Sequence, residues 1–419
     1  MTTGETTEGA VGFVIVGGGQ AAVEAIASLR GQGYEGTIIL IGDEPYLPYQ
    51  RPPLSKKYLD GTLSRERLYL RPEEFYRKSG VMVRLGETVH AIGRQTRTVV
   101  MGDGERLRYE KLLLTTGARA RHLEGVGVDL VGVYSLRSIQ GVDGLRTHFV
   151  EGARLVIVGG GYIGLEVAAI GVSMGLDVTV LEAAERVMAR VVAPEVSRFY
   201  EAVHEEKGVS IKTGVALARI EGTNGCVTNV VDKAGRTYPA DVVLVGVGAS
   251  PNDTLAAEAG LVVDDGVVVD HQARTSDEAI FAAGDCTRYH SVLYNRDIRL
   301  ESVQNAIEQA RIAATAMCGG MRAYDETPWF WSDQYDLKLQ IAGLSEGHDK
   351  TVMRGETASR SFALFYLKEG RLLAVDAVNR APEFMVSRKF IKERMCFDPN
   401  ILADENISMK EMAQRALQK

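Results

Sequence analysis

Two copies of one glycine-rich turn constrain the fold of this 419-residue chain more than any other feature. The first copy, Val11–Arg30, reads VGFVIVGGGQAAVEAIASLR, and the second, Arg154–Met174, reads RLVIVGGGYIGLEVAAIGVSM. In each copy a short β-branched run, typical of a buried strand, leads into clustered glycines and then into residues with helical period. The sequence therefore predicts two separate βαβ units.

Each turn matches the pattern that folds around the pyrophosphate of a dinucleotide. The matching positions are Gly17-x-Gly19-x-x-Ala22 and Gly159-x-Gly161-x-x-Gly164. The first glycine makes the tight turn, the second lets the backbone approach the phosphates, and the small third residue lets helix and strand pack. Free N–H groups at the helix N-terminus attract the anion. A glycine turn that binds nothing is the alternative, and two matched copies argue against it.

An acidic residue follows each turn at the distance expected of a ribose ligand. Asp43 lies 26 residues after Gly17, and Glu182 lies 23 residues after Gly159. The dinucleotide pattern expects an acid about 20 residues on, where a carboxylate can accept hydrogen bonds from ribose hydroxyls. Two complete dinucleotide sites are therefore predicted in one chain.

The residue at the end of the second unit indicates which nucleotide binds there. The charge of Glu182 would repel a 2′-phosphate, which favours NADH over NADPH. Arg186 and Arg190 lie nearby in the sequence. An arginine can accept a 2′-phosphate, and the alternative is that both lie on a solvated loop.

The rest of the chain alternates strand-like and helical segments, and its sequence pattern changes near the C-terminal end. Strand-like runs lie at 81–85 and 98–101, an apolar run at 112–114 and alternating runs near 227–231. Buried strands are predicted at 241–245 and 279–283, and helices at 194–207 and 303–317. From about Arg322 strand-like runs recur at 337–342, 362–367 and 372–378, and a helix is predicted at 382–394. Strands followed by a helix indicate a separate α+β domain.

Composition excludes several classes of function. A net charge of −7 argues against a general nucleic-acid binder, which needs a basic face. No apolar run approaches the roughly 20 residues of a membrane helix, so no membrane partner is expected. Met1–Ala10 is polar and acidic, which predicts a disordered leader rather than a signal peptide and a cytoplasmic location.

The cysteines indicate neither a metal site nor a disulfide framework. They are Cys226, Cys286, Cys318 and Cys396, and no two of them form a C-x-x-C pair. Metal-binding and disulfide-rich sequences have closer and more regular spacings. We therefore expect four reduced structural thiols and no metal.

Four further motifs give nearly the whole chain a resemblance to a known family. They are PYQRPPLSK at Pro48–Lys56, Thr116-Gly117, AAGD at Ala282–Asp285 and FWSDQ at Phe330–Gln334. With the two glycine turns, they resemble the FAD-dependent ferredoxin reductases of bacterial oxygenase systems. Disulfide-using relatives of that family carry a cysteine pair just after the first acidic residue, and Pro45–Lys57 contains no cysteine. The resemblance thus implies a reductase without a dithiol relay.

The expected fold class is α/β, with two Rossmann-like dinucleotide-binding domains plus a C-terminal α+β domain, and it is glutathione-reductase-like. The resemblance implies that the first unit binds FAD and the second binds NADH. The expected boundaries are 1–114 with 248–321 for a discontinuous FAD-binding domain, 115–247 for the NAD-binding domain and 322–419 for the C-terminal domain.

The resemblance also implies roles for single residues. Asp43 would hold the FAD ribose, Lys56 would lie beside the flavin N5, and Asp285 would bond the ribityl or phosphate portion. Glu166 would approach the nicotinamide, and Gly248 would line the NAD cleft. With the residues of the two turns, the expected cofactor-binding set is Gly17, Gly19, Ala21, Ala22, Asp43, Arg51, Lys56, Val89, Thr116, Gly117, Arg137, Gly159, Gly161, Gly164, Glu182, Arg190, Gly248, Gly284, Asp285 and Val303.

Several of these assignments have a structural alternative. Lys56 after a proline-rich loop could be a surface lysine, Glu166 an ordinary charge on a helix face, and Asp285 a turn residue. The cofactor role is favoured for Lys56 and Asp285, and the two interpretations of Glu166 are balanced. Arg137 and Val89 rest on the family match alone.

The predicted chemistry needs no acid–base dyad, because bound cofactors carry hydride transfer themselves. Electrons would pass from NADH through FAD to a 2Fe-2S ferredoxin, which accepts them one at a time. The ferredoxin would serve an oxygenase, either a haem-thiolate monooxygenase, which we favour, or a ring-hydroxylating dioxygenase. By resemblance, Arg311 and Lys410 match docking positions and Trp331 matches an aromatic between flavin and partner. A domain-interface anchor is the alternative for Trp331.

Two other functions stay open from the sequence. One is an NADH oxidase or quinone reductase with no protein partner. The other is a non-catalytic flavoprotein that NADH switches between states. The C-terminal segment has no long insertion, which favours the simple reductase, and a monomer is expected. The residues expected to act in catalysis are Lys56, Glu166 and Trp331.

Overall fold

The computed structural model describes residues 12–416 apart from 122, 124 and 126, so the expected N-terminal leader lies outside the described residues. The chain forms two compact units. Unit 1 comprises the described residues up to Gln50, Arg65–Arg119 and Ser250–Glu326. Unit 2 comprises Arg51–Ser64, Ala120–Ala249 and the described residues from Thr327 onward. The three-domain division made from the sequence stays a prediction.

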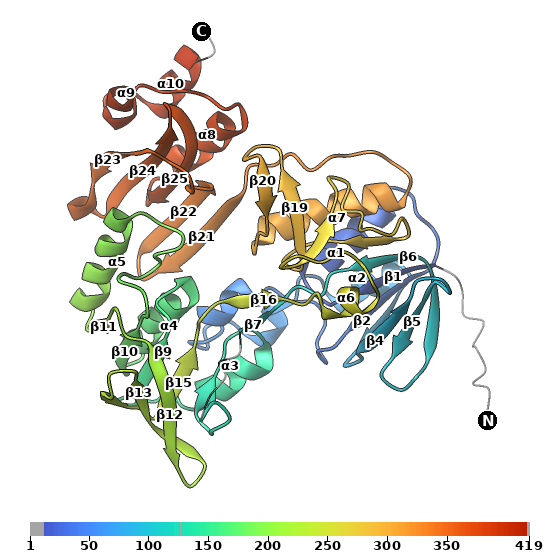
Figure 1. Cartoon of the computed structure of the whole chain (residues 1–419), viewed down its shortest axis with the longest axis horizontal. Helices are drawn as coiled ribbons and strands as arrows, with labels where there is room; N and C mark the ends of the chain where they lie inside the picture. The colour runs from blue at the N-terminus through green and yellow to red at the C-terminus, as the bar shows by residue number, and fades with distance from the viewer. Residues whose placement is uncertain (1–11, 122, 124, 126, 417–419) are drawn as a thin grey trace. The chain divides into compact units, whose positions relative to one another are not determined.

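Unit 1 is organised around one mixed sheet (Figure 1). Strands β3, β2, β1 and β6 are parallel in that order, and β6 is long enough to pair twice more. Its first residues pair antiparallel with β5, while Leu112–Leu114 pair parallel with β18. The strands of this sheet are β1 (Gly12–Val16), β2 (Ile38–Gly42), β3 (Val81–Leu85), β4 (Val89–Gly93), β5 (Thr98–Met101), β6 (Arg106–Leu114) and β18 (Ile280–Ala282).

Two helices cover the buried core of unit 1. Helix α1 (Gln20–Gly31) and helix α7 (Val303–Met317) pack on each other through buried alanines, which let two backbones approach closely. The same core includes Phe13 and Leu40 of the sheet. Other elements of unit 1 are η2 (Arg65–Leu68), α2 (Glu73–Lys78), α6 (Thr254–Glu258) and a small sheet of β17 (Val267–Val269), β19 (Thr287–Ser291) and β20 (Arg296–Ile298).

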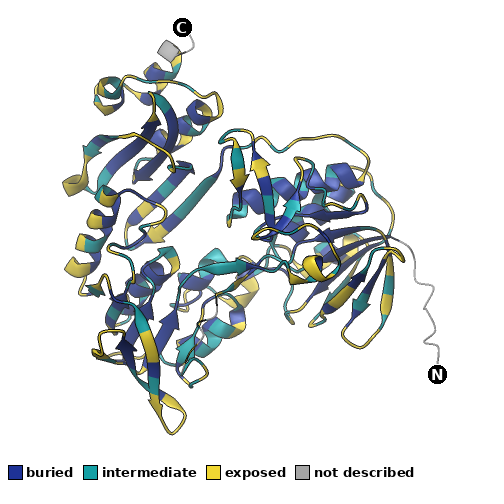
Figure 2. Cartoon of the chain, viewed as in Figure 1, coloured by how far each residue is buried: buried dark blue, intermediate teal, exposed yellow. Residues whose placement is uncertain are grey.

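Unit 2 repeats the strand–turn–helix plan in a five-stranded parallel sheet. The strand order is β11-β10-β9-β15-β8, and α4 follows β9 as α1 follows β1. The elements are η1 (Pro52–Ser55), β8 (Val133–Tyr134), α3 (Ile139–Arg146), β9 (Arg154–Val158), α4 (Tyr162–Ser173), β10 (Asp177–Leu181), α5 (Pro194–Glu206), β11 (Ser210–Lys212) and β15 (Val242–Val245). A more exposed sheet is formed by β12 (Leu217–Thr223), β13 (Cys226–Asp232) and β14 (Thr237–Pro239) (Figure 2).

The C-terminal part of unit 2 is an antiparallel sheet in the order β21-β22-β25-β24-β23. It shares a core with α5, where the rings of Phe199 and Phe362 lie 4.9 Å apart. Its elements are β21 (Trp329–Gln334), β22 (Leu337–Gly343), β23 (Lys350–Glu356), η3 (Thr357–Ser359), β24 (Ser361–Lys368), β25 (Arg371–Val378), α8 (Ala381–Lys392), α9 (Pro399–Ala403) and α10 (Met409–Ala416). The short strands β7 (Ala118–Ala120) and β16 (Ala249–Pro251) pair with each other.

Most predicted elements are confirmed, with small differences at their ends. The helix predicted at 303–317 has those bounds, and the helix predicted at 194–207 ends one residue earlier, at Glu206. The helix predicted to reach Arg394 ends at Lys392, because Arg394 adopts a left-handed φ of 55°. A left-handed residue cannot continue a right-handed helix.

Candidate functional site

The first glycine turn, in unit 1, has the geometry of a phosphate cradle. Gly17 has a φ of +110°, and a Cβ there would lie 2.3 Å from the carbonyl oxygen of Thr115. Only glycine fits this position. Gly19 is the N-cap of α1, no side chain caps that helix, and a Cβ there would meet nothing within 4 Å. The helix N-terminus therefore offers its N–H groups to an anion across open space.

The second turn, in unit 2, repeats these features. Gly159 also has a φ of +110°, and a Cβ there would lie 2.4 Å from the carbonyl oxygen of Gly246. Gly161 caps α4 without a side-chain bond and faces open space. The third position differs between the copies, because a Cβ at Gly164 would lie 2.2 Å from the Gly159 oxygen, whereas Ala22 packs fully buried in unit 1. Both turns fit a dinucleotide pyrophosphate.

A cavity of about 360 Å³ opens beside the first turn. Four residues expected to bind the first cofactor line it: Gly17, Asp43, Val89 and Thr116. Asp43 is exposed just beyond β2, as a ribose ligand must be. The Thr116 hydroxyl donates to the Asn252 carbonyl at 2.7 Å, and Asn252 also lines the cavity. The cavity thus brings the turn, the acid and the Thr-Gly motif together.

At the second site, Glu182 is already organised by the backbone. One carboxylate oxygen accepts from the Gly160 N–H at 2.7 Å, and the other accepts from the Ala184 N–H at 2.7 Å. The carboxylate is therefore fixed at the end of β10 beside the glycine turn. This position fits the predicted ribose ligand of a nucleotide without a 2′-phosphate.

The two arginines near Glu182 have different roles. Arg186 donates to the Val192 and Ala189 carbonyls at 2.8 and 2.9 Å and to the Ser197 hydroxyl at 2.6 Å. Its guanidinium is therefore held by hydrogen bonds to its own loop and to α5. Arg190 is exposed, and its guanidinium lies 3.4 Å from the position of a Cβ on Gly248. Arg190 and Gly248, both expected in the NAD site, therefore lie together.

A third cluster in unit 2 joins Lys56 to Glu166. The Lys56 ammonium lies 2.6 Å from one Glu166 carboxylate oxygen, and the Ser55 hydroxyl donates to the same oxygen at 2.5 Å. The Ser332 hydroxyl donates to the other oxygen at 2.6 Å. Only 4% of the Glu166 side chain is exposed, against 19% for Lys56. A buried charged pair of this kind persists because every oxygen has a donor.

Neither of the structural alternatives for this pair holds. Glu166 is not a charge on an open helix face, and Lys56 is not a free surface lysine, since they bind each other. Lys56 is the C-cap that follows η1, a 3-10 turn that the prolines at 52 and 53 begin. Ser55 and Ser332 were missed as site residues, although both lie inside the quoted motifs. Neither serine carries a sequence signal that distinguishes it from an ordinary polar position.

The remaining predicted cofactor residues fall on turns and helix ends. Gly117, Gly248 and Gly284 have φ values of +66°, +103° and +90°, which favour glycine. Arg51 donates to the Arg137 carbonyl at 2.5 Å in unit 2. In unit 1, Ala21 is buried in α1, Asp285 is half-buried after β18, and Val303 begins α7.

The residues expected to dock a partner are placed on separate elements. Arg311 lies on α7, where it donates to Glu24 and Glu308, each at 2.7 Å. Its side chain is only half-buried and is paired with both of these acids. Lys410 is exposed on α10. Trp331 is half-buried on β21, with its ring 5.6 Å from that of Trp329.

Comparison with known proteins decides the family. The family model of the pyridine nucleotide-disulphide oxidoreductases matches residues 12–310, and the model described as reductase C-terminal matches residues 329–413. The chain belongs to the pyridine nucleotide-disulphide oxidoreductase family. FAD and NAD(H) are therefore its cofactors, and it is an FAD-dependent oxidoreductase. The expected fold class is also confirmed.

Individual relatives cover almost the whole chain. Putidaredoxin reductase of Pseudomonas putida is 45% identical over 96% of this chain and 97% of its own length. Rhodocoxin reductase of Rhodococcus erythropolis is 42% identical over 95% of this chain and 93% of its own. The crystal structure of the covalent putidaredoxin reductase–putidaredoxin complex matches with a TM-score of 0.95 and 43% identity, covering 98% of this chain and 99% of the matched chain. The resemblance stated from the motifs is confirmed.

Three further features of the described residues concern the cysteines, the metal-ligating side chains and the helices. The four cysteines are unpaired; Cys286 is buried and the other three are exposed, so the packing role expected of all four holds for Cys286 alone. No group of metal-ligating side chains occurs in the part of the chain that the structure describes. Among the described helices, none has the length and apolar character needed to cross a membrane.

Removing the charge of Glu182 is expected to relax the choice of nucleotide. In Glu182→Gln the repulsion of a 2′-phosphate is lost, and one of the two backbone N–H groups loses its acceptor. The ratio of kcat/KM for NADPH to that for NADH should rise about tenfold, which corresponds to ~1.4 kcal/mol. Steady-state rates with both nucleotides and ferricyanide measure it. An unchanged ratio would show that another residue discriminates between them.

Proposed function

We propose that this oxidoreductase takes a hydride from NADH and passes the electrons singly from FAD to a 2Fe-2S ferredoxin. The observation that carries the proposal is the pair of matched dinucleotide turns, Gly17–Ala22 and Gly159–Gly164, in one chain. The ferredoxin is supported by the relatives' names and by the solved reductase–putidaredoxin complex. The absence of cysteine from Pro45–Lys57 leaves no dithiol there to carry electrons.

In this proposal the chain's own residues bind and orient. When bound, FAD supplies a ring that accepts two electrons together and releases them one at a time. The first turn and Asp43 hold the FAD, and the second turn and Glu182 hold the NADH. Lys56, fixed by Glu166, would supply a positive charge that stabilises the reduced flavin.

A second part of the proposal concerns the enzyme that receives the electrons from the ferredoxin. We infer that the ferredoxin serves an oxygenase and favour a haem-thiolate monooxygenase, on the resemblance of the motifs. Trp331, beside Trp329 on β21, is proposed to lie on the side that meets the ferredoxin. Lys410 and Arg311 are proposed to contact the acidic partner.

Stopped-flow mixing under anaerobic conditions tests the proposal. The yellow protein mixed with NADH should lose its flavin absorbance within one turnover time, and an added 2Fe-2S ferredoxin should restore it. A flavin that stays oxidised under excess NADH would contradict the hydride step. Oxygen consumption at the turnover rate without any ferredoxin would instead favour an NADH oxidase.

Reversing the charge of Arg311 tests the docking part separately. Arg311→Glu would place a third carboxylate beside Glu24 and Glu308 and repel an acidic ferredoxin. The kcat/KM for ferredoxin should fall about tenfold while NADH–ferricyanide activity stays unchanged. Arg94→Glu is the matched control, because Arg94 is also a partly exposed arginine of unit 1 that pairs with an acid, Asp277. Equal losses with both acceptors would rule out docking.

A further inference from the structure

A chain of hydrogen bonds in unit 2 leads from Tyr335 to the carboxylate of Glu166. The Tyr335 hydroxyl lies 3.0 Å from His204 Nδ1, and His204 Nε2 lies 2.8 Å from Gln334 Oε1. Gln334 Nε2 donates to the Ser332 hydroxyl at 3.2 Å, and Ser332 donates to Glu166 at 2.6 Å. We call these four residues, Tyr335, His204, Gln334 and Ser332, the donor chain.

Every hydrogen bond of the donor chain is donated in the direction of Glu166. An ionised carboxylate only accepts, so the single hydrogen of Ser332 goes to Glu166 and its oxygen must accept from the Gln334 amide nitrogen. The Gln334 oxygen then faces His204 Nε2, which must carry the ring hydrogen. His204 Nδ1 is left as the acceptor for Tyr335. One tautomer of neutral His204 satisfies every link.

The fold holds these groups away from water. Ser332 and Gln334 are two residues apart on β21, so they share one face of the strand. Their exposed fractions are 0% and 1%, and His204, on α5, is at 0%. Burial lowers the pKa of the His204 imidazole, which keeps the ring neutral at pH 7. A buried polar chain with every member paired is rigid.

The donor chain decides how one oxygen of Glu166 is bound. The other oxygen is occupied by Lys56 and Ser55, so Ser332 is the donor that fixes the rotation of the carboxylate. Without the Gln334 amide, the Ser332 hydroxyl could turn to other acceptors. Glu166 would then rotate, and the Lys56 ammonium that it holds would move with it.

We propose that Gln334 and His204 are positioning residues for hydride transfer, acting through Ser332 and Glu166 on the placement of the Lys56 ammonium. This inference rests on the proposed function, in which Lys56 acts on the flavin. Neither residue belongs to the quoted cofactor-binding set, and neither lies in a glycine turn. Their effect is therefore on the chemical step and not on nucleotide binding.

The variant Gln334→Leu removes both amide bonds and nearly preserves the side-chain volume. Three measurements are made on the FAD-loaded protein: the limiting rate of flavin reduction by NADH, the NADH concentration that gives half that rate, and the flavin midpoint potential. The limiting rate should fall about tenfold, as expected for a misplaced charge in the transition state. The half-saturating NADH concentration should stay unchanged, and the midpoint potential should become more negative, because the reduced flavin loses a nearby positive charge.

Two further variants keep the test decisive. Ser332→Ala removes the hydroxyl that donates to Glu166, and it should give the same three results as Gln334→Leu. It replaces Gln334→Leu in the test if that variant does not fold. Thr327→Val is the matched control: Thr327 is also buried in unit 2 and donates to the Arg388 carbonyl, but it lies outside the donor chain.

The inference is overturned if the wild-type flavin is reduced by NADH and both donor-chain variants keep its rate and potential. An equal rate loss in Thr327→Val would also overturn it, as a general structural effect. A wild-type flavin that NADH does not reduce would instead refute the proposed function itself.

Discussion

Gly17→Ala is expected to give a protein that does not retain FAD. The new methyl group would lie 2.3 Å from the Thr115 oxygen and 2.5 Å from its carbonyl carbon, and these are backbone atoms at the end of β6. The residue would also have to keep a φ of +110°. Together, strain and overpacking cost about 2–5 kcal/mol, or roughly 30-fold to several thousandfold in FAD affinity. Absorbance at the flavin band and FAD titration of the purified variant measure the loss.

The repeat supplies a matched comparison for this result. Gly159→Ala meets the same obstacle in unit 2, with the Gly246 oxygen at 2.4 Å. That variant should stay yellow and require a similarly higher NADH concentration for flavin reduction. Gly31→Ala is the control, because Gly31 ends α1 and a Cβ there meets nothing within 4 Å. A Gly17→Ala protein as yellow as the wild type would contradict the assignment of FAD to the first turn.

The sequence was most informative where local chemistry dictates the backbone. The two turns could be predicted because a glycine at φ +110°, a buried parallel strand and a helix of 3.6-residue period each leave a local pattern. The strand β23 was missed, because its letters, KTVMRGE, are those of a sheet edge with exposed positions. Edge strands alternate weakly, so their sequence resembles a polar loop.

In the candidate site, too, local contacts could be predicted from the sequence and contacts between distant residues could not. Glu182 was predictable from its distance to Gly159, and its bond to the Gly160 N–H is local to that turn. The bond between Ser332 and Glu166 joins residues 166 positions apart, and no periodicity or spacing reports such a contact. For the same reason the sequence did not predict the bond between Arg311 and Glu24, which lie 287 positions apart. Contacts made by tertiary packing are invisible to pattern analysis.

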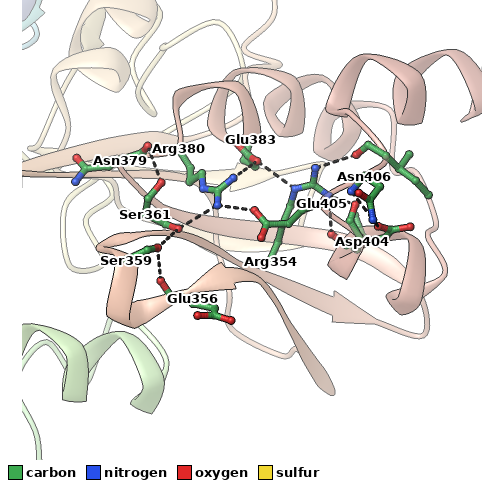
Figure 3. Close-up of polar contacts among 12 residues, drawn as sticks. Arg354, Glu356, Ser359, Ser361, Asn379, Arg380, Glu383, Asp404, Glu405 and Asn406 are labelled. Atoms are coloured by element: carbon green, nitrogen blue, oxygen red, sulfur yellow. Dashed lines mark hydrogen bonds and ion pairs between the residues drawn. The ribbon is translucent and has the colours of Figure 1, made fainter.

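A buried arginine holds the C-terminal segment to its sheet, and its removal should strongly destabilise unit 2. Arg354 on β23 donates to Glu383 at 3.1 Å and to the Asp404 carbonyl at 2.7 Å (Figure 3). It also donates to the Ile407 carbonyl at 2.8 Å. Only 4% of the Arg354 side chain and 5% of that of Glu383 is exposed. Arg354→Met would leave these acceptors buried with fewer donors, which costs about 3–5 kcal/mol.

The loss of stability in Arg354→Met should be largest in the segment that follows α8. Urea unfolding should show a lower midpoint, and limited proteolysis should cut first near 402–407, where the carbonyls lose their donor. The control is Arg360→Met, since Arg360 pairs with Glu206 and Asp336 near the surface, where ion pairs contribute under ~1 kcal/mol. Because α10 carries Lys410, cleavage there should also slow ferredoxin reduction before ferricyanide reduction. Equal stabilities of the two variants would mean that the carbonyls of this segment find water when the arginine is gone.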